Sequence, residues 1–122
     1  MTSDPRSLLP LPAHVFQILL SLLDHDLHGY ALIQDIARRT GGEMALGTST
    51  LYAAIKRMVK AGLLAETDRP ADADSDDERR RYYRATAFGQ AVAREEARRI
   101  RRLHDMIADA RALDAPSRPR TR

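Results

Sequence analysis

The sequence predicts a mainly α fold with a small β-wing, a winged helix-turn-helix followed by a long C-terminal dimerisation helix. Three observations predict this class. Two short helical segments flank a connection that contains Gly41, Gly42 and Gly47, as in helix-turn-helix units. A strand, a polar loop and a second strand follow, which is the outline of a wing. The last helical segment is too long for a domain of 122 residues to cover.

Composition places the chain among ordinary globular domains, with 43% hydrophobic residues, 30% charged residues and a formal net charge of +3. The absence of cysteine excludes disulfides, thiolate zinc sites and cysteine nucleophiles. No apolar run approaches the roughly 20 residues of a membrane span, and the N-terminus lacks the pattern of a secretory signal. We therefore expect a soluble, cytoplasmic protein.

Residues 1–10 are expected to form a flexible, proline-bearing tail before a domain that spans residues 11–86. The first helix should begin near Pro12, since proline fits a first helical position. Its apolar residues cover most of its circumference, so it needs cover on more than one side. It is either the central core helix or a helix that also contacts a second chain. These residues are Val15, Phe16, Ile18, Leu19, Leu20, Leu22 and Leu23.

The second helix is predicted from Tyr30 to Thr40, after a polar break at residues 24–29. Arg38 and Arg39 near its C-terminus oppose the helix dipole favourably, and Gly41–Gly42 end it. The inward-facing positions are expected to be Tyr30, Ile33, Ile36 and Ala37.

Residues 49–61 form the third predicted helix, and the sequence has a capping or stop residue at each end. Thr48 is expected to cap the start through its hydroxyl group, and Gly62 to end the helix in a left-handed conformation. The apolar positions recur at helical spacing and predict one buried stripe. They are Leu51, Ile55, Met58 and Val59.

The remaining surface of this third helix is small, hydroxyl-bearing or cationic. It includes both lysines of the chain and no carboxylate, and its residues are Thr50, Ala53, Lys56, Arg57 and Lys60. Such a face suits a DNA major groove, because small residues allow close approach while cations and hydroxyl groups reach phosphates and bases. The alternative is a solvated surface helix.

The wing is predicted as a strand at Leu63–Thr67, a loop at residues 69–78 and a second strand at residues 79–86. Thr86 then caps a last helix over residues 87–113, and residues 114–122 form a disordered tail. Within this helix Ile100, Leu103, Ile107 and Ala110 step three, four and three residues, which is the spacing of a coiled-coil seam.

This seam and the apolar first helix together predict a homodimer. The alternative is a helix that lies on its own domain with a frayed end. The expected interface residues are Phe16, Leu19, Leu20, Leu23, Ile100, Leu103, Ile107 and Ala110.

Catalytic and metal-binding patterns are weak. His25 and His28 lie near Asp24 and Asp26, but the segment is a turn with no further ligand, so His28 is better interpreted as part of the start of a helix. No nucleophile–base arrangement, phosphate-binding glycine loop or paired-carboxylate site stands out. We expect no metal, no cofactor and no enzymatic activity.

Six strings, in this order and at these separations, resemble the PadR-type winged-helix transcriptional regulators, in the short subgroup with a single C-terminal helix. The resemblance covers residues 11–113. The strings are Pro12-Ala13-His14, Leu27-His28-Gly29-Tyr30-Ala31-Leu32, Thr50-Leu51-Tyr52, Ala61-Gly62-Leu63-Leu64, Arg80-Arg81-Tyr82-Tyr83-Arg84 and Thr86-Ala87-Phe88-Gly89.

The resemblance implies a dimer that binds operator DNA, usually as a repressor, with the third helix in the major groove and the wing beside the minor groove. Some members release DNA when a small aromatic or drug-like molecule binds. A pocket for such an effector would lie at the dimer interface, lined by Phe16, Met106 and Ile107. The DNA-facing positions would be Ser49, Thr50, Tyr52, Ala53, Lys56, Arg57, Arg79, Arg80 and Arg81.

Two positions depart from the pattern of that family. Thr48 and Ser49 stand where many relatives have a glycine, which leaves the start of the third helix open. Leu11 stands where many have Ser or Thr, so the first helix lacks its usual capping oxygen and must fray or borrow another acceptor.

The wing and Tyr52 each leave two interpretations. The Tyr52 hydroxyl either reaches a phosphate or belongs to a purely packing side chain. The acids of the loop either stay in solvent while the arginines engage DNA, or pair with those arginines. These acids are Asp72, Asp74, Asp76, Asp77 and Glu78. The alternative function is a winged-helix protein-interaction module that dimerises through its last helix without specific DNA binding.

Overall fold

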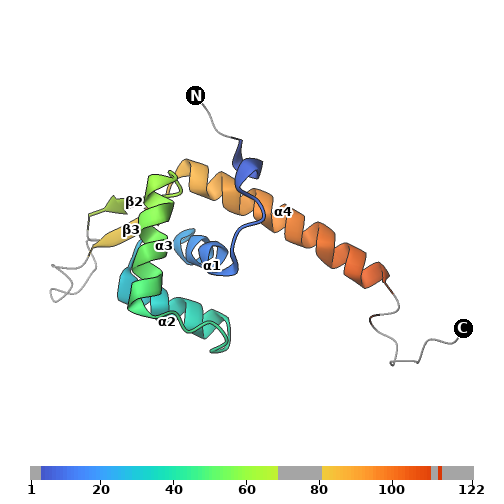
Figure 1. Cartoon of the computed structure of the whole chain (residues 1–122), viewed down its shortest axis with the longest axis horizontal. Coiled ribbons are helices and arrows are strands. Elements are labelled where there is room, and N and C mark those ends of the chain that lie inside the picture. Colours follow the sequence, from blue (N-terminus) through green and yellow to red (C-terminus); the bar gives the residue numbers. More distant parts are fainter. Residues whose placement is uncertain (1–3, 69–80, 111–112, 114–122) are drawn as a thin grey trace, which may run out of the picture.

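A computed structural model gives the fold and describes residues 4–68, 81–110 and 113. Helix α1 is central, α2 and α3 lie on one side of it, and α4 crosses the other side and projects away from the strands (Figure 1). The predicted fold class, a winged helix-turn-helix with a long C-terminal helix, is confirmed. The elements are η1 (Pro5–Leu8), α1 (Ala13–Leu22), β1 (Leu27–His28), α2 (Gly29–Arg39), α3 (Thr48–Lys60), β2 (Leu64–Thr67), β3 (Tyr82–Ala85) and α4 (Ala87–Asp109).

Helix α1 is the centre of the hydrophobic core. Ile18 and Leu19 are fully buried, and Val15 and Leu22 complete its inward face. Side chains from α2, α3, the strands and the first half of α4 close around it. The apolar circumference of α1 therefore reflects mainly its central position within one chain.

Helices α2 and α3 end in the same way. At the end of α3, Gly62 has a φ of 80°, its N–H bonds to Val59 O at 3.0 Å, and the Leu63 N–H bonds to Met58 O at 2.9 Å. This is a Schellman motif, and it confirms the predicted stop at Gly62. Helix α2 ends alike at Gly41 and Gly42, whose φ angles are 62° and 85°.

The predicted cap at Thr48 is wrong. Helix α3 begins one residue earlier than expected, so its N-cap is Gly47 and Thr48 is the first helical residue. No side chain caps this end. The predicted cap at Thr86 is confirmed, because its Oγ1 accepts a hydrogen bond from the Gly89 N–H at 3.0 Å.

Two residues that were expected to face inward are exposed. Tyr30 is 56% exposed and Val59 is 40% exposed. The buried face of α2 is centred on Leu32 and Ile36, which places Tyr30 roughly 200° around the helix from Leu32. In α3, Ala54 completes the buried face, so Val59 lies at its edge.

The sheet has the strand order β1-β3-β2, with both pairs antiparallel. Two wing strands are present as predicted, with Leu64 opposite Ala85 and Thr67 opposite Tyr82. The second is shorter than the predicted residues 79–86, since Arg81 and Thr86 lie outside it and residues 79–80 are not described. The strand β1 was missed, because two residues are too few for an alternating pattern to show. The rings of His28 and Tyr82 pack edge to face at 5.3 Å between centroids.

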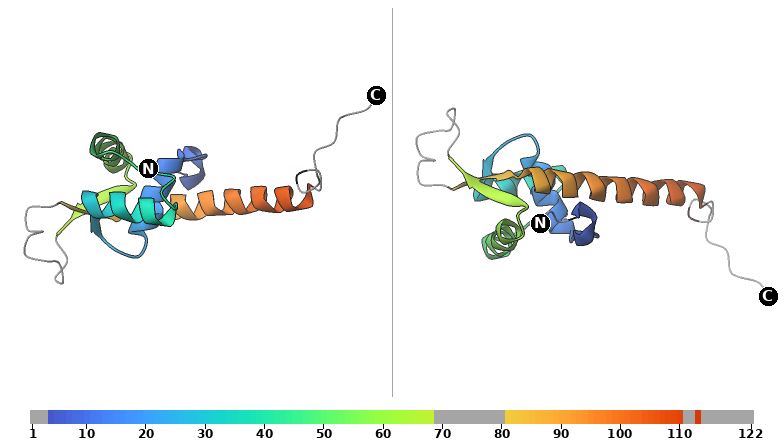
Figure 2. Two further views of the ribbon diagram at one scale, coloured as in Figure 1. Left: turned by 90° about the horizontal axis from the view of Figure 1, so that it is seen from below. Right: turned by 90° about the horizontal axis from the view of Figure 1, so that it is seen from above.

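The N-terminal segment, residues 4–12, differs from the predicted flexible tail. Residues 5–8 form the 3-10 helix η1, which contacts α4, and Leu9 and Leu11 pack against the core. These leucines give the segment apolar contacts that its prolines and polar residues obscured in the sequence. Both views in Figure 2 place η1 and α3 on the same side of the molecule.

Helix α4 packs on the domain only through its first half. Gly89, Val92, Ala93 and Glu96 are buried, whereas residues 100–109 are exposed and project beyond the domain (Figure 2). The helix ends at Asp109, with Ala110 as its C-cap, rather than at the predicted residue 113. Among the described residues no helix combines the length and apolarity needed to cross a membrane.

Candidate nucleic-acid interface

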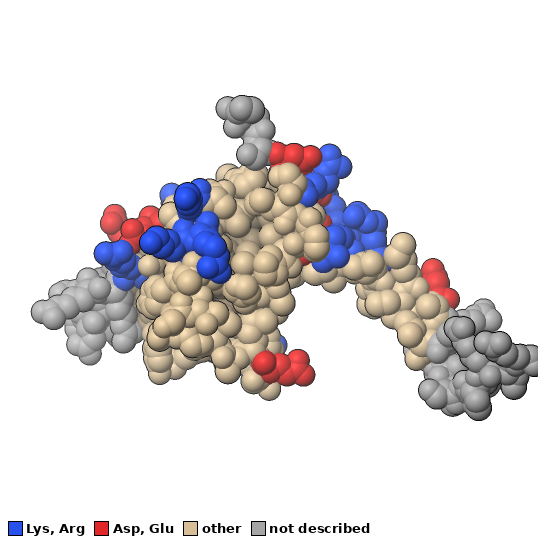
Figure 3. Space-filling model, in the orientation of Figure 1, with Lys and Arg blue, Asp and Glu red and all other residues tan. Residues whose placement is uncertain are grey.

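Helix α3 buries one face and presents the other to solvent. Its buried residues are Leu51, Ala54, Ile55 and Met58. Lys and Arg side chains gather over this helix in Figure 3, and α3 contains no acidic residue. All six helix positions predicted to face DNA are exposed, namely Ser49, Thr50, Tyr52, Ala53, Lys56 and Arg57.

The N-terminal end of α3 is suited to binding an anion. Because no side chain caps it, the backbone N–H groups of the first turn keep no side-chain acceptor. Thr48, Ser49 and Thr50 are exposed around this end and add three hydroxyl groups. A phosphate could therefore receive hydrogen bonds from backbone and side chains together.

Tyr52 packs against the start of α2. A Cβ atom added at Gly29 would lie 2.2 Å from the Tyr52 hydroxyl oxygen, so the two residues are in close contact. The Tyr52 side chain is still 47% exposed. The contact joins two of the sequence strings that carried the family resemblance, and it shows that Tyr52 has a packing role whatever else its hydroxyl group does.

A groove of about 330 Å³ separates α3 from the strands of the wing. Lys56 and Arg81 supply cations to it, and Glu66 supplies a carboxylate. Arg81 Nε lies 3.4 Å from Glu66 Oε1, and both side chains are largely exposed. Burial raises the pKa of Tyr83 at this groove, and the Glu66 charge adds to the rise. The lining residues are Tyr52, Ile55, Lys56, Val59, Glu66, Arg81 and Tyr83.

The partner of Arg81 was not anticipated. Only the acids of residues 72–78 were expected as partners for the wing arginines, whereas Glu66 stands on the other strand of the wing. The choice of Glu66 as the partner of Arg81 depends on the register of β2 and β3, which places Glu66 opposite Tyr83. Arg79, Arg80 and the acids at 72, 74, 76, 77 and 78 lie outside the described residues.

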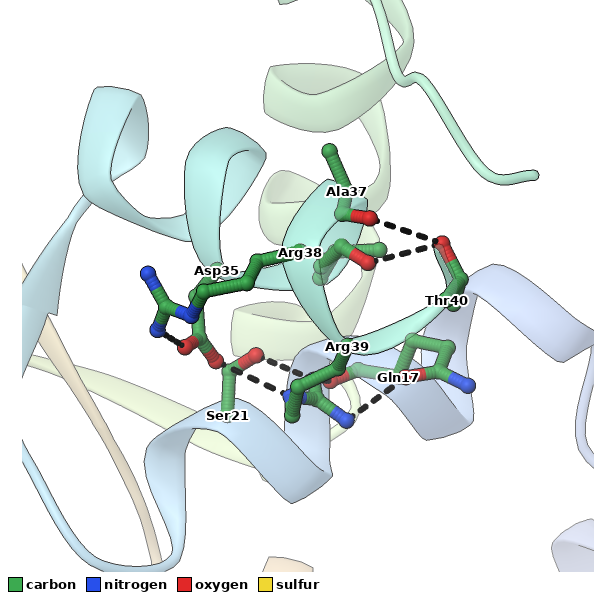
Figure 4. Close-up of polar contacts among 8 residues, drawn as sticks. Gln17, Ser21, Asp35, Ala37, Arg38, Arg39 and Thr40 are labelled. Carbon is green, nitrogen blue, oxygen red and sulfur yellow. Dashed lines mark hydrogen bonds and ion pairs between the residues drawn. The ribbon is translucent and has the colours of Figure 1, made fainter. Parts of the chain in front are cut away.

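The base of the helix-turn-helix is held by Arg39 of α2, which bridges to α1 (Figure 4). Its guanidinium group donates to Gln17 Oε1 at 2.7 Å, to Gln17 O at 2.8 Å and to Ser21 Oγ, and it pairs with Asp35 at 3.0 Å. Burial alone would raise the pKa of Asp35, but hydrogen bonds from Ser21 and Arg39 outweigh it and lower that pKa. The network fixes α2, and α3 packed on it, against the core helix.

The residues predicted at a dimer interface divide into three groups, which are fully buried, half-buried and exposed in one chain. Leu19 is fully buried in its own domain, so its predicted place on a contact surface is wrong. Phe16 and Leu20 are half-buried on α1, and Ala110 is half-buried at the end of α4. The exposed members are Leu23, Ile100, Leu103 and Ile107, joined on α4 by Met106.

The effector residues are not brought together by one chain. Phe16 packs against the core from α1, whereas Met106 and Ile107 are exposed on the projecting half of α4 (Figure 1). Among the histidines, His28 caps α2, because its Nδ1 accepts a hydrogen bond from the Ala31 N–H at 3.1 Å. In the described part of the chain, no three His, Cys, Asp or Glu side chains form a metal-binding group.

The exposed face of α3, the wing groove and the rigid helical scaffold define a winged-helix DNA-binding protein of the transcription-regulator class. The chain belongs to the transcriptional regulator PadR-like family, whose model matches residues 18–95. The resemblance drawn from the sequence strings is thereby confirmed. Members of this class are generally not enzymes.

Individual proteins are similar to this chain in sequence or in fold. An uncharacterized protein X of Lysinibacillus sphaericus is 34% identical over 83 residues, which are 67% of this chain and 73% of the relative. A PadR family transcriptional regulator from Eggerthella lenta has a TM-score of 0.60 at 28% identity, covering 86% of this chain and 82% of its own. A PadR-like regulator from Bacillus cereus has a TM-score of 0.68 at 20% identity, covering 84% and 92%.

Proposed function

We propose that the protein is a homodimeric repressor that binds a pseudo-palindromic DNA operator. Helix α3 enters the major groove, and the base of the wing lies beside the backbone. The observation that carries the proposal is the exposed face of α3, which combines small residues, hydroxyl groups and cations without one carboxylate. Buried packing on the opposite face keeps this helix rigid, so its side chains are presented in a fixed geometry.

Each group on α3 has a role that follows from its chemistry. Lys56 and Arg57 reach phosphate oxygens or guanine, and Arg57 can do so through two parallel hydrogen bonds. The uncapped N-terminal end receives a phosphate and sets the register of the helix. Ala53 allows the backbone to approach the base edges. Arg81, on the wing, binds the DNA phosphate backbone after its ion pair with Glu66 has broken.

Dimerisation follows from the second half of α4. Ile100, Leu103 and Ile107 form an exposed apolar stripe with Met106 at its edge, and a second copy of the helix would bury it. Leu23 and the half-buried Phe16 and Leu20 of α1 extend this surface. Two-fold symmetry then requires half-sites about 10 base pairs apart, or a multiple of that spacing.

An effector site of the kind found in some PadR proteins requires the same dimer. A partner chain would bring a wall of side chains to Met106 and Ile107 that one chain lacks. The apolar character of Phe16, Met106 and Ile107 suits a small aromatic molecule. Binding of the effector would change the angle between the DNA-binding domains of the two chains and release the DNA.

The test is binding to DNA from the protein's own promoter region, measured by fluorescence anisotropy across a salt series. Tight, sequence-selective binding that weakens steeply with salt supports the proposal. The variant Lys56→Ala with Arg57→Ala should remove selective binding and lower the salt slope by about one unit for each phosphate that is no longer neutralised. Arg101→Ala with Arg102→Ala removes the same charge from α4 and serves as the control.

Two results would contradict the proposal. Full affinity of the Lys56→Ala, Arg57→Ala variant would remove α3 as the DNA-reading helix. Weak binding that is equal on all sequences would instead favour the protein-interaction module, whose partner would cover the apolar stripe of α4.

A further inference from the structure

Glu96 of α4 is the only charged side chain that is buried among the described residues, with 1% of its surface exposed. Its Oε2 accepts a hydrogen bond from the Leu11 N–H at 2.7 Å, although the two residues are 85 positions apart in the chain. Its Oε1 pairs with Arg99 one turn further along α4. A buried carboxylate needs such partners, because burying an unpaired charge is very unfavourable.

This bond holds the chain immediately before α1 without capping the helix. Pro12 is the N-cap of α1 and no side chain caps it. A cap accepts from N–H groups of the first turn, whereas Glu96 accepts from the Leu11 N–H before the N-cap, so the bond fixes the chain where it enters α1. The dimerisation helix is thus attached to the N-terminal segment at a defined point.

The other side of the N-terminal segment reaches the DNA-reading helix. A small cavity of about 180 Å³ lies between them, with Leu8, Leu11 and Pro12 on one wall and Ala54, Arg57 and Met58 of α3 on the other. Arg57 is one of the two cations on α3 that are expected to contact DNA. The segment and α3 therefore line one cavity beside a side chain that is expected to bind DNA.

Local hydrogen bonds give the segment a fixed shape. Asp4 Oδ1 accepts from the Arg6 N–H at 2.9 Å, and the Ser7 hydroxyl donates to Asp4 O at 2.7 Å. These bonds hold η1 as one turn of helix against α4. The segment is thus an ordered part of the domain, with α4 on one side and the cavity that it shares with α3 on the other.

Helix α4 has a second attachment to α3 at its own start. A Cβ atom at Gly89 would lie 2.1 Å from Leu63 O, and the Thr86 hydroxyl donates to Gly62 O just beyond the end of α3. Seven residues, or about 10 Å along the axis, separate Gly89 from Glu96. One attachment would let α4 rock about its first turn, whereas two fix its angle to α3.

We propose that Glu96 is a positioning residue for DNA recognition, which sets the angle between α4 and α3 through the N-terminal segment. The inference rests on the proposed function. In a dimer held by α4, this angle determines the distance between the two copies of α3. Losing it should weaken binding to the operator far more than binding to arbitrary DNA, which does not require a fixed spacing.

The chain offers a matched control in the preceding residue. Glu95 also pairs with the arginine three positions on, Arg98, at 3.0 Å, but on the outer side of α4. Replacing either glutamate with alanine removes one negative charge and one i,i+3 ion pair. Only the Glu96 substitution removes the bond to Leu11, and it also empties a buried position, so the variant Glu96→Gln, which keeps the side-chain volume, is compared beside it.

The experiment begins with selection of an operator from random-sequence DNA by the wild-type protein. Affinities for the selected duplex and for a scrambled duplex are then measured, together with sedimentation and far-UV circular dichroism. We expect Glu96→Ala to lose about tenfold or more on the selected duplex, as for loss of one buried hydrogen bond, and less than about twofold on the scrambled duplex. Glu95→Ala should bind both duplexes like the wild type, and all variants should remain dimers.

Two further variants keep the test decisive if Glu96→Ala does not fold. Glu96→Gln retains an acceptor for the Leu11 N–H and should restore most of the selected-duplex affinity. Leu8→Ser alters the apolar lining of the cavity that the segment shares with α3, at a residue that is 38% exposed, so folding is not at risk. It should lose several-fold affinity, on the order of the effect of removing one partly buried leucine side chain, on the selected duplex only.

Several outcomes overturn the inference. Folded Glu96→Ala and Leu8→Ser variants with wild-type affinity for the selected duplex would do so, as would equal losses on both duplexes. A wild-type protein that selects no sequence would instead overturn the proposed function itself, and this inference with it.

Discussion

At the scale of single residues, Glu66 differs in charge from its neighbours at the wing groove. It is an acid, whereas the other described charged residues that line this groove are cations. It stands on β2 beside the groove and holds Arg81 at 3.4 Å. DNA must either displace this carboxylate or accept its repulsion. Glu66 thus pairs with a wing arginine, a pairing that the sequence predicted only for the acids of the loop.

Replacing Glu66 with Gln should therefore tighten binding to arbitrary DNA. The expected gain is a few-fold, because an exposed ion pair contributes roughly 0.2–1 kcal/mol. The salt slope should become steeper as Arg81 gains a phosphate. Anisotropy on a scrambled duplex measures both, with Asp105→Asn on α4 as the control. If the gain persists when Arg81 is also replaced by Ala, Glu66 does not act through Arg81.

The buried Glu96 predicts a dependence of stability on pH. The hydrogen bond from Arg99, together with that from the Leu11 N–H, lowers the pKa of Glu96 despite its burial. A lowered folded-state pKa contributes stability above the unfolded value of about 4.3, and that contribution is lost as pH falls through the folded-state pKa.

Thermal unfolding of the wild type and of Glu96→Gln between pH 7 and pH 3 measures this contribution. The wild type should lose more stability than the variant across the acid range, because only the wild type must protonate this carboxylate. Glu95→Gln is the reference for removing a carboxylate elsewhere on α4. Parallel losses in all three proteins would contradict the prediction.

At the scale of elements, the packing depends on two glycines that differ in what they contact. Gly89 lets α4 approach the Leu63 carbonyl, and a Cβ atom would lie 2.1 Å from that backbone oxygen. Gly29 lets Tyr52 approach α2, and a Cβ atom there would meet the far end of a side chain. Backbone cannot move aside, whereas a tyrosine ring can.

Gly89→Ala should therefore destabilise the fold, by about 1–3 kcal/mol or more as in other overpacked sites. Denaturant unfolding measures the free energy directly. The control is Gly47→Ala, since Gly47 has a negative φ and a Cβ atom there would have no atom within 4 Å. Equal stability of the two variants would show that α4 does not need this close approach.

Gly29→Ala should change DNA binding more than stability. The added methyl group must displace the Tyr52 ring, which lies on the DNA-facing side of α3 next to the wing groove. We expect a loss of about 1 kcal/mol or less in unfolding free energy and a larger loss in operator affinity. Tyr52→Phe separates the position of the ring from the hydroxyl group, and unchanged affinity in both variants would leave Tyr52 without a role in binding.

Elements with long periodic patterns were predictable from the sequence. The four α-helices, both wing strands, the stop at Gly62 and the cap at Thr86 follow from local rules. The strand β1, the helix η1 and the burial of Leu32 in place of Tyr30 on α2 were missed, because each is decided by contacts with distant residues. For the same reason the chemistry of α3 was predictable, whereas Glu66 and Glu96 were not: their partners are set by strand register and by an 85-residue separation.

At the scale of the whole molecule, α4 divides into a half that belongs to the domain and a half that projects from it. The buried positions Val92 and Glu96 continue into Ile100, Leu103 and Ile107 along one face of the helix. The same stripe thus changes along its length, from packing within the domain to an apolar surface that none of the described residues covers.

Leu103→Glu should therefore abolish the dimer without unfolding the domain, since Leu103 is 43% exposed in one chain. Symmetry places the substitution twice in the interface, so the loss should exceed about 3 kcal/mol at roughly 1.5–3 kcal/mol for each buried leucine. Sedimentation equilibrium measures the change in association, with Arg101→Glu, roughly 200° around the helix, as the control. The monomer should keep weak binding to arbitrary DNA but lose the operator, because a single α3 reads only one half-site. If the variant remains a dimer with full operator affinity, another surface must join the two chains, and the angle set by Glu96 would no longer determine the spacing of the recognition helices.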